Sequence, residues 1–193
     1  MAKEGKHGIT ADTAKNILFG AGTIHKNLKY TESKWNFTES IIGATNGGSK
    51  LSIVPEITPI ELDGALVAVK GLKIKTGETA TMEINLAELT KDIIKAATLG
   101  HDGESSDATY DLIESKPNIV AGDYLENIAF VGQTLDERNV IAILDNALCT
   151  NGFEQEGKNK EGAVGAYTFE CHADTSGDLD TLPWHIYYPK AKV

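Results

Sequence analysis

Residues 35–97 constrain the fold most, because turn residues and alternating apolar side chains there predict several consecutive elements without conflict. Apolar residues at even spacing over residues 35–41 predict a half-buried strand. Asn46-Gly47 then offers two residues that accept positive φ, and the alternation resumes over residues 51–53. A first β-hairpin with a Gly-rich loop is therefore expected.

A second hairpin is expected to follow at Asp63-Gly64, a strong two-residue hairpin signal, with its return strand over residues 65–74. Thr76-Gly77 predicts the next reversal. Residues 79–86 then give the most regular alternation of the chain, in which the apolar members are Ala80, Met82, Ile84 and Leu86. This pattern is typical of a strand with one buried face.

The periodicity changes after this strand, and the spacing predicts an amphipathic helix over about residues 86–97. Asn85 and Glu88 resemble a capping box at its start, and Gly100 is a natural stop. Several antiparallel strands followed by one short helix predict a mainly β fold, in which the helix covers a sheet edge or face.

The second half continues the β pattern. Residues 124–131, 140–148 and 164–171 are expected to be strands, and the β-branched content of residues 140–148 favours a buried strand over a helix. Residues 100–111 are polar and predict a surface loop. We expect one domain over residues 1–193, with an N-terminal arm at residues 1–15 and a C-terminal aromatic segment at residues 183–193.

The charge is unevenly distributed. The formal net charge of −10 divides into +1 for residues 1–99 and −11 for residues 100–193. A protein that holds nucleic acid through its phosphates needs a basic surface, so sequence-specific DNA or RNA binding is disfavoured. Passive contact with DNA stays open, since an acidic surface would let DNA pass without retaining it.

Composition predicts a soluble protein without export signal or membrane insertion, because no apolar segment reaches the length of a membrane span. Cys149 and Cys171 are the only cysteines. A disulfide between them is conceivable, but buried thiols in a reducing compartment are the favoured interpretation.

The sequence contains three partial binding motifs, and each lacks residues that its ligand requires. Residues 43–50, GATNGGSK, resemble a phosphate-binding loop in composition, but Ser49 and Lys50 stand in the wrong order and a strand is expected to follow. His25 occupies the place of the third glycine in a dinucleotide pattern begun by Gly20 and Gly22. A calcium-loop spacing lacks its glycine and glutamate; it consists of Asp174, Ser176, Asp178 and Asp180. We therefore expect no enzyme activity, metal or cofactor.

Three segments carry a resemblance to a known family: IIGATNGGSK, PEITPIELDG and VKGLKIKTGETATMEINLAEL. Together they resemble the major tail tube protein of long, non-contractile tailed bacteriophages. The resemblance implies a β-sandwich-like or barrel-like subunit with a flanking helix, which assembles into homohexameric rings. Such rings stack around a tape-measure protein, between tail-tip initiator and terminator proteins, and the tube later conducts DNA into the host. A virion tail protein assembled in the host cytoplasm is the expected function.

The resemblance also directs attention to particular residues. Glu83 and Glu170 are the candidates for the tube lumen, because each lies on the polar face of an expected strand and the wall of a tube has to be sheet. Candidates for loops between rings are Gly47, Gly48, Asp102, Gly103 and Glu104. The alternative from another class is a virion-associated β-sandwich binding module for carbohydrate or a receptor, which clustered exposed aromatic residues would favour.

Overall fold

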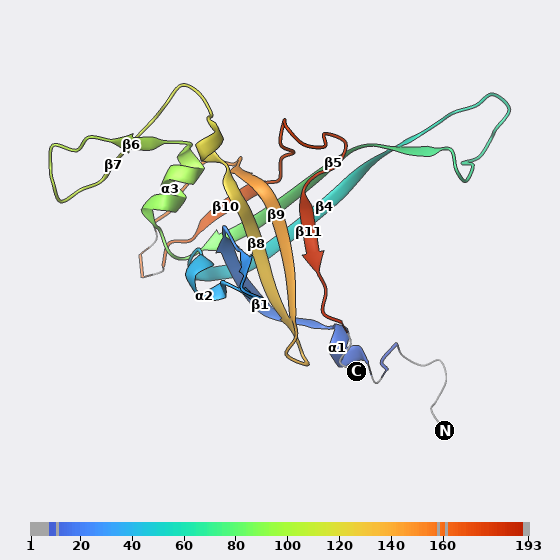
Figure 1. Ribbon diagram of the computed structural model, residues 1–193, viewed down its shortest axis with the longest axis horizontal. Helices are drawn as coiled ribbons and strands as arrows, with labels where there is room; N and C mark the ends of the chain where they lie inside the picture. Colours follow the sequence, from blue (N-terminus) through green and yellow to red (C-terminus); the bar gives the residue numbers. More distant parts are fainter. Residues whose placement is uncertain (1–7, 11, 158, 161, 191–193) are drawn as a thin grey trace.

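The computed structural model describes residues 8–10, 12–157, 159–160 and 162–190. The expected arm at residues 1–15 lies partly outside these residues, as do residues 191–193 of the C-terminal segment. The fold is mainly β, with antiparallel sheets and few helices, consistent with a β-sandwich or barrel-like fold, as predicted (Figure 1).

Seven strands form the main sheet, in the order β1-β8-β9-β10-β5-β4 with β11 also paired to β9. They are β1 (Leu18–Lys26), β4 (Thr45–Pro59), β5 (Lys73–Leu86), β8 (Leu125–Thr134), β9 (Asn139–Cys149), β10 (Gly165–Glu170) and β11 (Trp184–Tyr187). Two small ribbons pair β2 (Tyr30–Thr31) with β3 (Lys34–Trp35) and β6 (His101–Gly103) with β7 (Leu112–Glu114). The helical elements are α1 (Thr13–Asn16), α2 (Phe37–Ser40), α3 (Lys91–Thr98) and the 3-10 turn η1 (Ala121–Asp123).

Strand β9 joins two halves of this sheet. It pairs with β8 along most of its length but meets β10 only at Phe169↔Cys149 and Glu170↔Leu148. Beyond that point the Asn151 side chain replaces the backbone partner of β10: its Nδ2 donates to the Ala166 carbonyl (2.9 Å) and its Oδ1 accepts from the Thr168 amide (2.8 Å). The amide thus extends the ladder where the strand ends.

The main core lies between the two halves. Ile128 and Leu144 on one side pack in the same cluster as Met82, Ile84 and Phe169 on the other. Helix α3 adds Ile93 and Ala97 to this cluster, and β11 adds Trp184 at its margin. The alternation over residues 79–86 is confirmed, since its four apolar members are all buried.

A second cluster covers the opposite face of β8 and β9. It contains Leu28, Ala129, Ile141 and Ile143, with Trp35, Phe37 and Val131 packed against it. Residues 140–148 are consequently buried on both faces, which explains their continuous apolar run and confirms the predicted strand.

The predicted strand over residues 35–41 is wrong. Trp35 ends the short ribbon and the chain then enters the single turn of α2. The Ser40 hydroxyl donates to the Asn36 carbonyl at 2.8 Å and stabilises that turn. Alternation over so few residues fits a ribbon followed by a turn as well as it fits a strand.

The predicted turns are also corrected. Gly47 lies inside β4, where the register shifts between Thr45 and Ser49, so the first hairpin does not exist. Thr76-Gly77 lies inside β5, opposite the shift between Glu56 and Ile57. Asp63-Gly64 does form a turn, but within a long connection over residues 60–72 rather than at a tight hairpin. One long hairpin, β4 with β5, replaces the shorter hairpins expected there.

Helix α3 exists, but it starts at Lys91 instead of residue 86. Thr90 is its N-cap, and its hydroxyl accepts from the Ile93 amide at 3.4 Å. Asn85 remains in β5 and donates its side-chain amide to the carbonyls of Gly47 and Gly48, 3.3 Å each. The predicted cap residue therefore stabilises the register shift of β4 instead of the helix.

Candidate functional site

The outer part of the β4–β5 hairpin projects from the body as an arm (Figure 1). Strand β10 supports β5 only as far as Thr81, whereas β4 and β5 stay paired from Val54↔Thr79 out to Pro59↔Lys73. At the usual rise per residue this projection is about 20 Å long before its tip. We call residues 54–79 the arm and residues 60–72 its tip.

Polar contacts fix the root of the arm to the body. The Trp184 indole Nε1 donates to Glu78 Oε2 at 3.1 Å, and Lys75 pairs with the same carboxylate at 2.9 Å. The hydrogen bonds from Lys75 and Trp184 hold the pKa of Glu78 below its ordinary value. An ionised Glu78 thus links β5 to β11 where the arm leaves the core.

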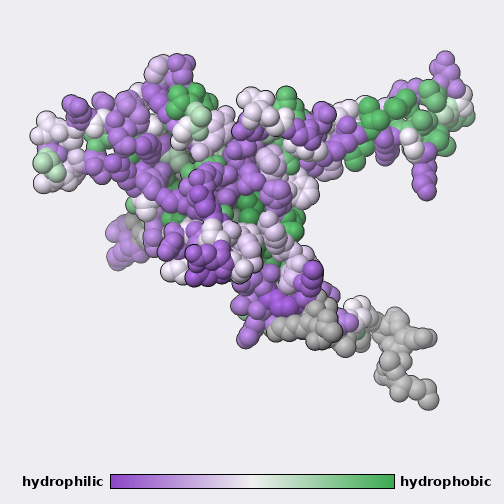
Figure 2. All heavy atoms as spheres, in the orientation of Figure 1, coloured by the Kyte–Doolittle hydropathy of each residue, from purple (hydrophilic) through white to green (hydrophobic). Residues whose placement is uncertain are grey.

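The arm exposes aliphatic side chains to water. Leu66 is 99 % exposed and Val67 78 %. The other large apolar residues exposed on it are Val54, Ile57, Ile60, Leu62, Val69 and Ile74. Figure 2 shows apolar residues gathered on the outer half of the arm, with hydrophilic residues at its far end. With about 60–120 Å² for a fully exposed aliphatic side chain, the arm presents roughly 300–600 Å² of apolar surface. That matches the apolar part of one side of a standard protein interface, about 800 Å² in all.

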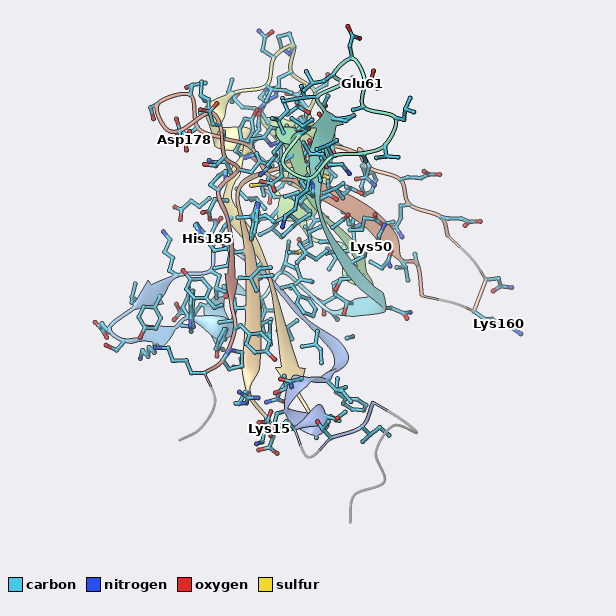
Figure 3. All side chains as sticks on the ribbon, turned by 90° about the vertical axis from the view of Figure 1, so that its right-hand side faces the viewer. Lys15, Lys50, Glu61, Lys160, Asp178 and His185 are labelled. Carbon is cyan, nitrogen blue, oxygen red and sulfur yellow. The ribbon has the colours of Figure 1, made fainter. Side chains whose placement is uncertain are left out.

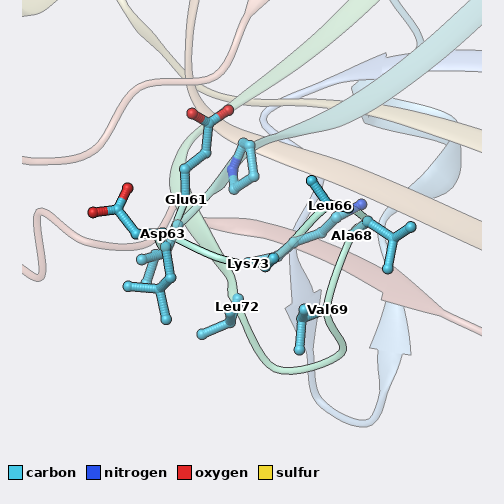
Figure 4. Close-up of a pocket in the computed structure, with 12 residues that line it drawn as sticks. Glu61, Asp63, Leu66, Ala68, Val69, Leu72 and Lys73 are labelled. Atoms are coloured by element: carbon cyan, nitrogen blue, oxygen red, sulfur yellow. The ribbon is translucent and has the colours of Figure 1, made fainter.

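The tip encloses a crevice of about 560 Å³ between its two limbs (Figure 4). Its turns place Gly64 and Gly71 at φ of +89° and +93°, and the Ile60 amide closes the loop on the Leu72 carbonyl at 2.8 Å. Aliphatic side chains line most of the crevice, while Glu61, Asp63 and Lys73 stand among them. The lining suits apolar contact better than acid–base chemistry.

The lumen candidates lie on one polar face of the sheet. Thr81 pairs with Glu170, and Glu83 pairs with Thr168, so all four side chains share that face. Lys50 on β4, labelled in Figure 3, forms an ion pair with Glu83 at 2.7 Å. The Lys50 ammonium thus balances the charge of Glu83 locally. The sequence pattern did not reveal this partner.

The loop candidates occupy two different settings. Gly47 and Gly48 lie in β4 at its register shift, with φ of +95° and +80°. Asp102 and Gly103 lie in β6, and Glu104 follows it. Asp102 pairs with Lys91 (3.1 Å) and Lys95 (2.6 Å) on α3. The expected loop over residues 100–111 is therefore partly a small hairpin tied to the helix, and the role of all five residues between rings stays a prediction.

The most buried polar network surrounds His25. Its Nδ1 lies 2.8 Å from Ser40 Oγ and its Nε2 lies 2.8 Å from Thr23 Oγ1. Since the Ser40 hydroxyl donates to the Asn36 carbonyl, Nδ1 carries the proton and Nε2 accepts from Thr23. Burial lowers the pKa of His25. No carboxylate completes a triad among these contacts, and the network joins β1 to α2.

The potential metal ligands of the described residues are dispersed, and the two thiols are buried. Among the described residues, no three His, Cys, Asp or Glu side chains are grouped as metal ligands. Cys149 and Cys171 are free and buried, and burial raises the pKa of both thiols, that of Cys171 to about 12. Within the part of the chain that is described, no helix has the length and apolar character to cross a membrane.

An aromatic group lies on the second cluster. The Trp35 ring contacts Tyr30 and Tyr187, with centroids 5.1 Å apart in each case. Tyr30 is 59 % exposed and Tyr187 49 %. The three rings therefore form a partly exposed aromatic group at the surface of the second cluster.

No protein-family model matches the chain, and no curated protein matches it. The arm is the feature that sequence reasoning missed. Its signal was the excess of apolar residues between Val54 and Ile74, more than two strands of a one-sided sheet would bury.

Proposed function

We propose that this protein is a structural subunit that assembles with copies of itself, as the major tail tube subunit of a long, non-contractile phage tail. The observation that carries the proposal is the apolar arm, on which Leu66 is 99 % exposed and Val67 78 %. A two-stranded hairpin is at best marginally stable in water, so one with this much apolar surface is best explained by burial against a neighbour.

Assembly into hexameric rings that stack as a tube accounts for further features. The main sheet ends at β4 and at β1, where Ile41 and Ile42 already occupy the edge beside His25 and Ile24; strands of neighbours can add to β4 and to the part of β1 before Ile24. The polar face with Glu83 and Glu170 would line the lumen, where serine, threonine and balanced charges give DNA little to bind. A tape-measure protein, tail-tip initiator and terminator are the partners that this function requires.

A pair of matched variants tests the proposal. Leu66→Asp places a charge on the arm, whereas Leu179→Asp does so at a residue that is 68 % exposed in the acidic turn. Both should fold with the unfolding midpoint of the wild type. Negative-stain images should show rings or tubes for the wild type and Leu179→Asp, but none for Leu66→Asp. A wild-type protein that stays monomeric at every concentration, even with initiator and tape-measure protein present, would refute the proposal.

A second candidate function is a virion-associated carbohydrate-binding or receptor-binding module, favoured by the group of Tyr30, Trp35 and Tyr187. Isothermal titration with oligosaccharides would test it. Binding that is lost in Tyr187→Ala but kept in Leu66→Asp would favour the module, whereas absence of binding to any glycan tested would count against it.

A further inference from the structure

A shallow apolar groove opens at the seam between the two halves of the sheet. It has a volume of about 280 Å³ and is lined by Leu18, Leu51, Phe130, Val140 and Ile186 among others. Ser49 is the one polar residue in its lining, and no charged side chain contributes. Leu18 and Ile186 are 45 % and 49 % exposed. The groove is therefore an acceptor for an apolar group.

We propose that this groove receives the arm tip of a second copy of the chain, with Leu66 and Val67 as the inserted side chains. The inference rests on the proposed function and names the surface to which the arm binds. The tip and the groove are complementary features of one chain, and the arm projects away from the body, so a neighbour's groove is the natural partner (Figure 1).

The sizes agree. At about 30 Å³ for each water-sized group, the groove holds roughly nine such groups. Leu66 and Val67 together contribute seven side-chain carbons. The roughly 300–600 Å² of apolar surface on the whole arm matches the apolar part of one side of a stable interface, and Leu66 and Val67 are its most exposed members.

The contact is heterologous, because the arm and the groove are different surfaces of the subunit. Each copy then offers one arm and one groove, and repetition gives a closed ring or an open filament. This geometry makes a prediction that a symmetric dimer does not share: one subunit with a defective arm and one with a defective groove should form a single complex and stop.

Leu66→Glu removes the arm contact and Ile186→Glu removes the groove contact, both at exposed positions. Each variant alone should sediment as a monomer, whereas an equimolar mixture should form a heterodimer and nothing larger. If the mixture stays monomeric, or Ile186→Glu alone assembles, while the wild type forms tubes, the groove assignment is overturned and the proposed function survives. A wild type that never assembles overturns both.

A cysteine pair tests the same contact without adding charge. The double variant Leu66→Cys with Ile186→Cys should form intermolecular disulfides on oxidation, seen as a ladder on a non-reducing gel. Leu66→Cys with Leu179→Cys is the matched control and should give a much weaker ladder. The native thiols contribute little background, since Cys149 and Cys171 are buried. Assembled tubes that give equal ladders from the two pairs would overturn the inference.

Discussion

Asn127 offers the sharpest test of how the body is held together. Strand β1 ends at Lys26, and Asn27 turns the chain away with φ of +52°. The Asn127 side chain then replaces a strand partner for Leu28: its Oδ1 accepts from the Leu28 amide at 2.8 Å and its Nδ2 donates to the Leu28 carbonyl at 3.1 Å. Asn127 is 8 % exposed and Leu28 3 %, so water does not reach these groups freely.

Asn127→Ala leaves a buried amide and a buried carbonyl of Leu28 without partners. At about 1–3 kcal/mol for each of these two groups, the free energy of unfolding should fall by about 2–6 kcal/mol. At about 2–4 °C for each kcal/mol in a domain of this size, the Tm should fall by roughly 4–24 °C. Trp35 packs in the same cluster as Leu28, so urea unfolding followed by tryptophan fluorescence gives the loss directly.

The control for this change is Asn118→Ala, at an exposed residue, which should alter the free energy of unfolding by less than about 0.5 kcal/mol. The two variants should share the wild-type m-value, because the surface exposed on unfolding is the same. The reasoning fails if Asn127→Ala, at an unchanged m-value, is as stable as Asn118→Ala.

Three further predictions concern titration and charge. Burial lowers the pKa of His25, so below about pH 6.5 the unfolded chain binds a proton that the folded chain does not. The free energy of unfolding should therefore fall on acidification, by up to about 1.4 kcal/mol per pH unit. His25→Gln should flatten this slope when urea unfolding is measured at several pH values. Burial raises the pKa of Cys171 from 9.0 to about 12, so between these pH values the thiol stays protonated in the folded state but ionises in the unfolded state. The free energy of unfolding should therefore fall as the pH rises above about 9, and Cys171→Ala should reduce that loss. Glu83→Lys with Glu170→Lys should give assembled tails that eject DNA slowly or incompletely, and normal ejection from such tails would exclude these residues from the lumen.

The sequence predicted a strand correctly where the apolar side chains of that strand are buried within the same subunit. In β5 the residues from Ala80 to Leu86 lie between β4 and β10, and their alternation matched the structure. The same holds for β9, which is covered on both faces within the subunit. In each case the local pattern and the tertiary contact select the same structure.

Prediction failed where a local signal fits more than one context. Asp63-Gly64 and Thr76-Gly77 both accept turns, but the first lies in the arm tip and the second opposite a register shift. Gly77 pairs with Glu56 inside the ladder, and an added Cβ would meet only the flexible end of the exposed Glu56 side chain, so no reversal occurs at this glycine. Only the pairing of β4 with β5 distinguishes these cases.

The arm marks the limit of reasoning from one chain, because an apolar pattern does not say whose surface will cover it. Ile57 pairs with Lys75 and Ile74 pairs with Thr58, so the two isoleucines lie on opposite faces of the arm. They are 58 % and 48 % exposed. An interface that covered one face would leave one of them in water. The proposed assembly therefore requires that other subunits cover both faces of the arm, with its tip in one neighbour's groove and its length against further surface. Two subunits that contact each other through one face would not cover both.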